Sequence, residues 1–218
     1  MKMNIRNKIL ISLAVGLLGV AQVGAQTVIV DTTTQPPDVA DGSPDSVYDT
    51  RWLANKFTTD SSTYNLAGVT LTLSTAVDTS SSFQVEIYSD SAGTPNASLA
   101  VLSGNSTPSS PATYTPLATL QLNANSSYWV VAKVLSPTGE YTWHFAGPSG
   151  ASFTGVGSLG GFSASTDAGA SWSGEDANFP ALFSVTGNAT VPEPSSYAAI
   201  FGVAALGYGA FSRRLRRA

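Results

Sequence analysis

The chain has 218 residues, of which 43% are hydrophobic and 11% charged, and it contains no cysteine. This length allows one or two domains, and the lack of cysteine excludes disulfide bonds and thiol nucleophiles. Seven of the ten basic residues lie at the two ends, so the part between keeps three against all fourteen acidic residues, a formal net charge of −11. That charge excludes nucleic acid as a partner, because nucleic-acid binding needs a positive footprint.

The amino-terminal residues 1–25 have the pattern of a secretory signal peptide. Three basic residues among the first eight precede an apolar run at 9–20, and Val23 and Ala25 follow as the small pair before the cleavage point. We therefore predict export by the Sec machinery and cleavage after Ala25. An uncleaved membrane anchor is the less favoured alternative, because the run is shorter than the roughly 20 residues of a spanning helix.

Residues 26–47 form an acidic entry segment rich in proline and aspartate. Asp38, Asp41 and Asp45 carry the carboxylate oxygens that Ca²⁺ prefers. Their spacing does not match an EF-hand loop. A solvated acidic segment is therefore the favoured interpretation and a calcium site the alternative, and the sequence predicts no other cofactor.

Residues 48–188 are predicted to form an all-β domain. Segments 68–74 and 82–88 alternate apolar and polar residues, the period of a strand with one buried face. Turns rich in Gly, Pro, Ser and Asn separate further strands, which we predict at 51–58, 98–102, 114–122, 127–135, 140–145 and 181–186. Short strands in this number, without a helical stripe, predict a two-sheet sandwich or jelly roll. The Gly/Ser-rich stretch 146–174 is interpreted as a long loop, which either has a function or only connects two strands.

Five stretches of this body carry a resemblance to a known family. They read R-W-L-A-N-K-F-T-T, Y-N-L-A-G-V-T-L-T-L, F-Q-V-E-I-Y-S-D-S-A-G-T-P, Y-W-V-V-A and Y-T-W. Together, over residues 48–186, they resemble the choice-of-anchor R domain. The resemblance implies a β-sandwich body joined to a carboxy-terminal surface anchor, and it implies no catalytic residues.

The segment Ser165–Trp172 reads S-T-D-A-G-A-S-W and fits the Asp-box pattern, a hairpin turn found in sialidases and in unrelated β-proteins. The Asp167 carboxylate can accept hydrogen bonds from turn amides, and Gly169 can adopt a positive φ. A sialidase would need several such boxes and several arginines. One box in a body with a single arginine predicts a structural turn.

The sequence gives little support to catalysis. A hydrolase triad would need His144, the only histidine, and it lies in the alternating stretch Y-T-W-H-F. The nucleophile elbow G-x-S-x-G is missing from the sequence. Glu86, Glu140 and Glu175 could supply a glycosidase pair, but nothing in their spacing singles out two of them. We therefore predict that the protein is not an enzyme.

Aromatic side chains in a jelly-roll body can also stack on sugar rings. Tyr88, Tyr114, Tyr128 and Trp172 are the candidates for such stacking. Core packing explains the same residues. An exposed aromatic row would favour carbohydrate binding, and a buried set would favour the structural interpretation.

The last twenty-eight residues, 191–218, contain three elements in order. The first is Val191-Pro192-Glu193-Pro194, whose prolines cannot continue a strand ladder or a helix interior. The second is an uncharged run at 197–211, about 22 Å long as a helix and predicted as a short transmembrane segment. The third is a basic tail, which the positive-inside rule keeps in the cytoplasm and which consists of Arg213, Arg214, Arg216 and Arg217.

These three elements resemble the PEP-CTERM sorting signal of bacterial surface proteins, over residues 189–218. The resemblance implies that a membrane-embedded exosortase recognises Pro192, Glu193 and Pro194. The tail is then removed or exchanged, and the protein enters the cell envelope or extracellular matrix. We thus predict an exported surface or matrix protein with a structural or adhesive role; the alternative is a module that binds exopolysaccharide.

Overall fold

The computed structural model describes residues 26–37, 45–74, 82–137, 139–146 and 152–190, together with residue 202. The predicted signal peptide with Ala25, the sorting motif 191–194 and the basic tail 213–217 lie outside these residues. The strands of the described part are β1 (Thr27–Asp31), β2 (Asp45–Val47), β3 (Trp52–Thr58), β4 (Tyr64–Leu71), β5 (Phe83–Ser91), β6 (Thr94–Ser103), β7 (Ala112–Pro116), β8 (Gln121–Leu122), β9 (Ser127–Val134), β10 (Tyr141–Trp143), β11 (Ser158–Ser165) and β12 (Phe183–Ala189).

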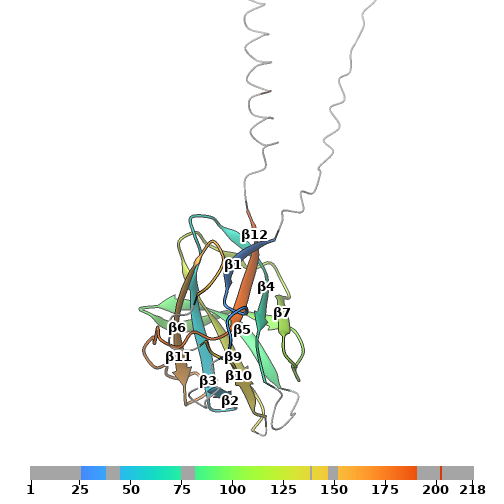
Figure 1. Ribbon diagram of the computed structural model, residues 1–218, viewed down its shortest axis with the longest axis vertical. Coiled ribbons are helices and arrows are strands. Elements are labelled where there is room, and N and C mark those ends of the chain that lie inside the picture. The colour runs from blue at the N-terminus through green and yellow to red at the C-terminus, as the bar shows by residue number, and fades with distance from the viewer. Residues whose placement is uncertain are drawn as a thin grey trace, which may run out of the picture.

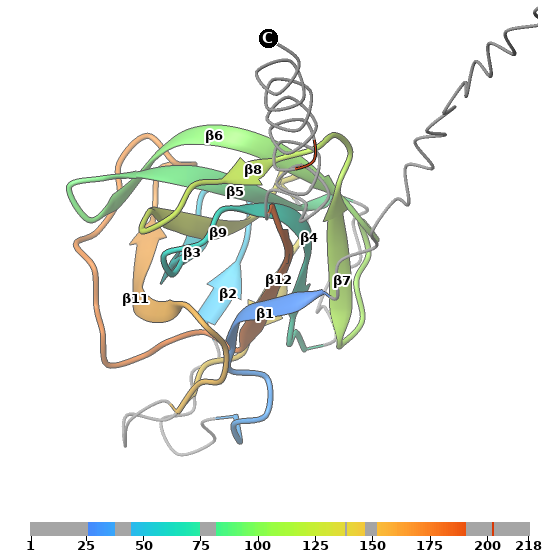
Figure 2. The same ribbon diagram turned by 90° about the horizontal axis from the view of Figure 1, so that it is seen from above.

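Ten of these strands form one sheet, in the order β1-β12-β4-β7-β6-β5-β9-β3-β11, with β8 paired to β4. Strands β2 and β10 form a separate two-stranded ribbon. Seen from above, the sheet curls round so that β3, β5, β9 and β11 face β1, β4 and β12 (Figure 2). The all-β prediction is confirmed, and the two packed layers are joined into one sheet.

The two ends of this sheet meet along a short seam. Asp31 of β1 and Thr154 exchange two backbone hydrogen bonds of 2.8 and 2.9 Å, and Gly157 donates to Ile29 at 2.9 Å. Gly155 has φ +128°, and a Cβ there would lie 2.3 Å from the Ile29 carbonyl oxygen. The sheet is therefore nearly closed, and the glycines of the stretch interpreted as a loop allow the close approach that closes it.

The interior is filled by the apolar side chains that point inward from the strands. Phe57, Leu71, Val85 and Trp143 are fully buried, and the Trp143 Nε1 donates to the Leu182 carbonyl at 3.0 Å. Burial of each such side chain contributes about 1.5–3 kcal/mol relative to exposure. The core thus depends on long-range packing between the two layers.

Every predicted strand has a counterpart, although 114–122 is divided into β7 and β8. Three strands were not predicted. β1 and β2 belong to the segment 26–47, and β1 buries Ile29 and Val30 completely, so the body begins at Thr27 and not at residue 48. β11 was missed because its Gly and Ser residues have low strand propensity.

Both ends of the body leave from the same side. Thr27 pairs with Gly187, and Thr190 donates to the Thr63 carbonyl at 2.8 Å. The start of β1 and the end of β12 lie at the upper end of Figure 1, far from the β2–β10 ribbon. Within the described residues, no helix has the length and apolar character needed to cross a membrane, and the predicted span 197–211 lies outside them apart from Gly202.

Candidate functional site

The outer face of β3, β5 and β9 carries a cluster of aromatic and charged side chains. Register pairs Trp129 on β9 with Tyr88 on β5 and with Lys56 on β3. Alternation along these strands turns this set away from the core. We call it the outer cluster; it comprises Trp52, Lys56, Glu86, Tyr88, Trp129, Lys133, Trp172 and Glu175, and it rests on Ala54 and Val131.

Both lysines of the body lie in the outer cluster, and each makes one ion pair and one cation–π contact. Lys133 forms an ion pair with Glu86, and its Nζ lies 4.6 Å from the Trp52 ring centroid. Lys56 pairs with Glu175 in the same way, and its Nζ lies 5.7 Å from the ring centroid of the neighbouring tryptophan on β9. The side chains of Glu86 and Lys133 are only 5% and 9% exposed, so each charge depends on its partner. The two lysines thus balance the two glutamates of the cluster.

The predicted Asp-box turn forms and lies beside this cluster. The Asp167 Oδ1 accepts the Ser171 amide at 2.8 Å and the Ser165 hydroxyl at 2.7 Å, and its Oδ2 accepts the Ser171 hydroxyl at 2.5 Å. The bonds from Ser171, followed by that from Ser165, lower the pKa of Asp167 to about 2. The carboxylate therefore holds the turn as an anion at neutral pH.

The turn contacts the outer cluster at two points, Gly169 and Trp172. Gly169 has φ +84°, and a Cβ there would lie 2.5 Å from the Trp52 ring. Trp172 packs edge-on against Tyr88, with ring centroids 6.4 Å apart and an angle of 68°. Burial, with the nearby Glu86 carboxylate, raises the pKa of Tyr88 to about 12. A side chain at position 169 would thus collide with the Trp52 ring, so the contact between the turn and Trp52 requires a glycine. The turn also holds Trp172 over the sheet.

The four candidate stacking residues separate into two pairs. Tyr88 and Trp172 meet on the outer face, where both are half-buried. Tyr114 and Tyr128 are only 1% and 6% exposed and contact interior phenylalanine rings. This burial corrects the prediction for the second pair, since their rings cannot reach a glycan. Trp52 was not among the residues predicted from the sequence, although a strand that turns its neighbour Leu53 inward turns Trp52 outward.

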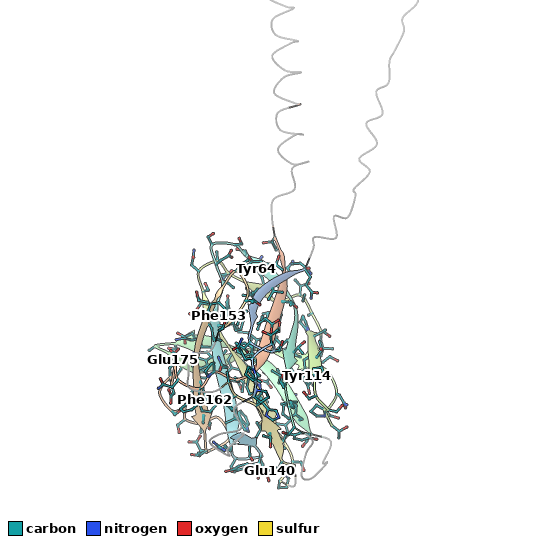
Figure 3. The ribbon with its side chains drawn as sticks, in the orientation of Figure 1. Tyr64, Tyr114, Glu140, Phe153, Phe162 and Glu175 are labelled. Carbon is teal, nitrogen blue, oxygen red and sulfur yellow. The ribbon has the colours of Figure 1, made fainter. Side chains whose placement is uncertain are left out.

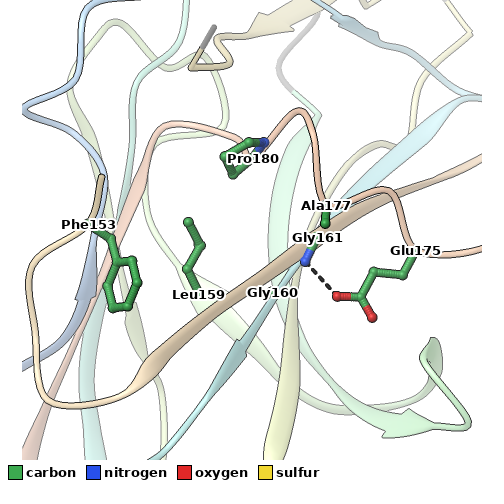
Figure 4. Close-up of a pocket in the computed structure, with 7 residues that line it drawn as sticks. All are labelled: Phe153, Leu159, Gly160, Gly161, Glu175, Ala177 and Pro180. Carbon is green, nitrogen blue, oxygen red and sulfur yellow. Dashed lines mark hydrogen bonds between the residues drawn. The ribbon is translucent and has the colours of Figure 1, made fainter. Parts of the chain in front are cut away.

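A cleft of about 340 Å³ adjoins the cluster at β11 (Figure 4). Its apolar wall includes Phe153, Leu159 and Pro180, and Glu175 lies at its polar side, accepting the Gly161 amide at 2.7 Å. In Figure 3, Phe153 and Glu175 lie on the opposite side of the body from Tyr114. Because the carboxylate of Glu175 is already engaged by an amide and a lysine, the cleft offers a ligand mainly apolar contacts.

The possible calcium ligands are not assembled by the described residues. Asp38 and Asp41 lie outside them, and Asp45 belongs to β2 but its side chain is not described. Within the described part of the chain, no three His, Cys, Asp or Glu side chains come together as a metal site would require. The calcium alternative thus stays a hypothesis.

His144 makes a contact that its spacing did not predict. Its Nε2 lies 2.7 Å from the Ser74 hydroxyl, and burial lowers the pKa of the imidazole. Among the described residues, no carboxylate is hydrogen-bonded to the ring, so the orienting member of a triad is missing there. Of the three glutamates, Glu86 and Glu175 each pair with a lysine, and Glu140 lies at the lower end of the body in Figure 3, below Glu175. That the protein is not an enzyme stays a prediction.

The comparison with known families concerns the tail. Residues 190–217 match the PEP-CTERM protein-sorting motif. The chain carries an exosortase sorting signal. This signal marks an exported protein that is held transiently in the membrane and then reaches the cell envelope or the exterior.

The match begins where the body ends, one residue after β12. It covers the tail alone, and no curated protein matches the chain. The resemblance of the body to the choice-of-anchor R domain therefore stays a prediction.

Proposed function

We propose that the body is an adhesive or structural component of the cell envelope or extracellular matrix, displayed there through exosortase sorting. The observation that carries this proposal is the position of β12, the strand that leads directly into the sorting motif. It is hydrogen-bonded to β4 over seven registered residue pairs and to β1 over four. A force on the tail would act along β12 and load both ladders together.

The nearly closed sheet also supports a displayed role. Open strand edges recruit further chains, and pairing β1 with residues 154–157 covers one such edge. The charge of −11 keeps exported copies apart in solution. A discrete, soluble body tethered at one end is what a surface adhesin requires.

Carbohydrate binding is the second candidate function. The half-buried Tyr88 and Trp172 favour it, because two aromatic rings meet on the outer face of a rigid sheet. A protein can adhere by this means, so the two candidates are compatible.

The sorting step is tested by replacing Pro192 and Glu193 with alanine in the full chain. We expect the amount of protein on the surface of washed cells to fall below detection and the amount in the membrane fraction to rise, because exosortase would no longer recognise the motif. The matched control is Ser195→Ala with Ser196→Ala, directly after the motif. Equal surface amounts in the two variants would contradict the role of the motif.

The adhesive role is tested on the producing cells. Cells that lack the protein should retain less matrix and attach less firmly under flow than wild-type cells. The sorting-defective variant should behave like the deletion, although the body is still made. Unchanged attachment in the deletion strain would overturn the proposed function.

A further inference from the structure

We infer that the outer face beside Tyr88 binds a neutral polysaccharide, an inference that rests on the proposed surface role. The contact surface consists of Tyr88 and Trp172 with two exposed apolar residues of the neighbouring strand β6, Leu99 and Val101; we call these four the ridge. Leu99 and Val101 are 44% and 41% exposed. Val101 pairs across the strands with Glu86, and Leu99 is the extra residue at the bulge between the pairs Tyr88–Ser98 and Ile87–Ala100. Exposed apolar side chains next to half-buried aromatic rings mark a binding surface.

The four residues of the ridge are uncharged although the body is strongly acidic. The carboxylates of Asp90 and Asp167 accept hydrogen bonds from Trp129 and from the Asp-box turn. Beside the ridge, Glu86 is neutralised by Lys133, and farther along β3 Lys56 is neutralised by Glu175. No lysine is left over in the outer cluster to attract an anionic polymer. The remaining charge of the exported part, −11 in total, would repel one. A polysaccharide without charged groups is therefore the matching ligand.

The size of the ridge favours a sugar over a protein partner. A stable protein interface takes roughly 20–30 residues on each side, whereas the ridge has four. Sugar rings present flat C–H faces that can pack on an aromatic ring, and their hydroxyl groups need polar partners at its edge. The exposed Ser98, which lies opposite Tyr88, can supply such a partner.

The two rings of the ridge are held in place before any ligand arrives. Tyr88 is registered against the fully buried Trp129, whose Nε1 donates to Asp90 Oδ1 at 2.8 Å. Trp172 is fixed by the Asp-box turn, in which Asp167 accepts three hydrogen bonds. A preordered surface loses less entropy on binding, so even weak stacking contributes to affinity. This gives the turn a role in positioning a binding residue.

The experiment is affinity electrophoresis of the full protein, produced with both signals and purified from the cell envelope. Native gels would contain hydroxyethyl cellulose, a mixed-linkage β-glucan, a galactomannan or dextran as neutral probes, and alginate as the polyanion. We expect at least one neutral polymer to retard the protein and alginate to leave its mobility unchanged. Retardation by none of the neutral probes, or by alginate alone, would overturn the inference.

Variants then locate the binding surface. Tyr88→Ala should weaken retardation at least tenfold, and Leu99→Ser with Val101→Ser, which alters only exposed side chains, should weaken it several-fold. The control is Thr113→Ala with Thr115→Ala, on the outer face of β7, which should bind like the wild type. Tyr88→Ala also removes the packing of Tyr88 against Trp172. The Leu99/Val101 variant changes only exposed side chains, so a loss of binding in that variant cannot be attributed to disturbed packing. Unchanged retardation of that folded variant refutes the ridge as the site.

Failure of this inference can be told apart from failure of the proposed function. The ridge variants should still reach the cell surface, because the sorting motif is intact. If no neutral polymer binds but deletion cells attach poorly, the adhesive role stands and the ridge is not its basis. If deletion cells attach normally, the adhesive role falls whatever the gels show.

Discussion

The outer faces of the two layers differ in kind. On β4, β7 and β12 the outward side chains are small and hydroxylated: the Thr70 and Thr113 hydroxyls lie 3.0 Å apart, and Thr186 donates to the Gly68 carbonyl at 3.3 Å. On β3, β5 and β9 they are large rings and ion pairs, such as Trp129 with Lys56. The inward faces of both layers are equally apolar.

This difference shows where the sheet is free to vary. Inward positions must fill one shared core, so both layers supply the same kinds of side chain. Outward positions have no such common constraint. The hydroxyl groups of the threonine face bond to one another and to the backbone, while the outer cluster gathers three of the four tryptophans of the chain and both lysines of the body. The outer cluster is therefore the better place to look for function.

The largest expected effect comes from removing Trp129, the centre of the outer cluster. Trp129→Ala should lower the free energy of unfolding by about 3–5 kcal/mol, since the ring is fully buried and its loss leaves a cavity. Urea denaturation followed by far-UV circular dichroism measures this loss. A loss below about 1 kcal/mol, well under that range, would mean that the cluster is a loose surface patch.

Breaking one buried ion pair should have the next largest effect. Glu86→Gln should cost about 3 kcal/mol, because it leaves the Lys133 ammonium unpaired at a side-chain exposure of 9%. The matched variant Glu86→Leu with Lys133→Met should be much closer to the wild type, since it removes both charges. If the double variant is less stable than the single one, the pair itself is stabilising.

The Asp-box turn should give the protein a distinct response to acid. The pKa of Asp167 in the folded state, about 2, lies below its ordinary value of 3.8. Its stabilising contribution is therefore complete above about pH 4 and is lost as the pH falls toward 2. Between those values, wild-type melting temperatures should fall more steeply than those of Asp167→Asn.

Ser171→Ala is the control for this pH effect, since it removes the hydroxyl that contributes most to the lowered pKa. Its acid dependence should lie between those of the wild type and Asp167→Asn. Parallel melting curves for all three proteins from pH 5 to 2 would show that the turn is not held by the carboxylate.

The smallest effect belongs to the threonine face. Thr113→Ala should change the free energy of unfolding by no more than about 0.5 kcal/mol, as exposed substitutions usually do. The same urea series measures it. A loss comparable to that of Trp129→Ala would remove the contrast between the two faces.

Local chemistry was readable from the sequence. Alternation at 68–74 and 82–88 predicted β4 and β5, because the two-residue period follows from the strand itself. The Asp-box turn was predicted for the same reason: Asp167 and Gly169 act within eight residues of chain. The sorting tail is also local, a linear signal for an enzyme to recognise.

Partners far apart in the chain were decided only by the tertiary structure. Tyr88 and Tyr128 look alike in sequence, yet one lies on the outer face and the other in the core, because strand register fixes which side each ring takes. The continuous apolar stretch around Trp129 hides that register. The seam at Gly155 and the ion pair of Lys56 with Glu175 likewise join residues more than a hundred positions apart. Periodicity describes one strand at a time, and only the packing of the whole sheet brings these groups together.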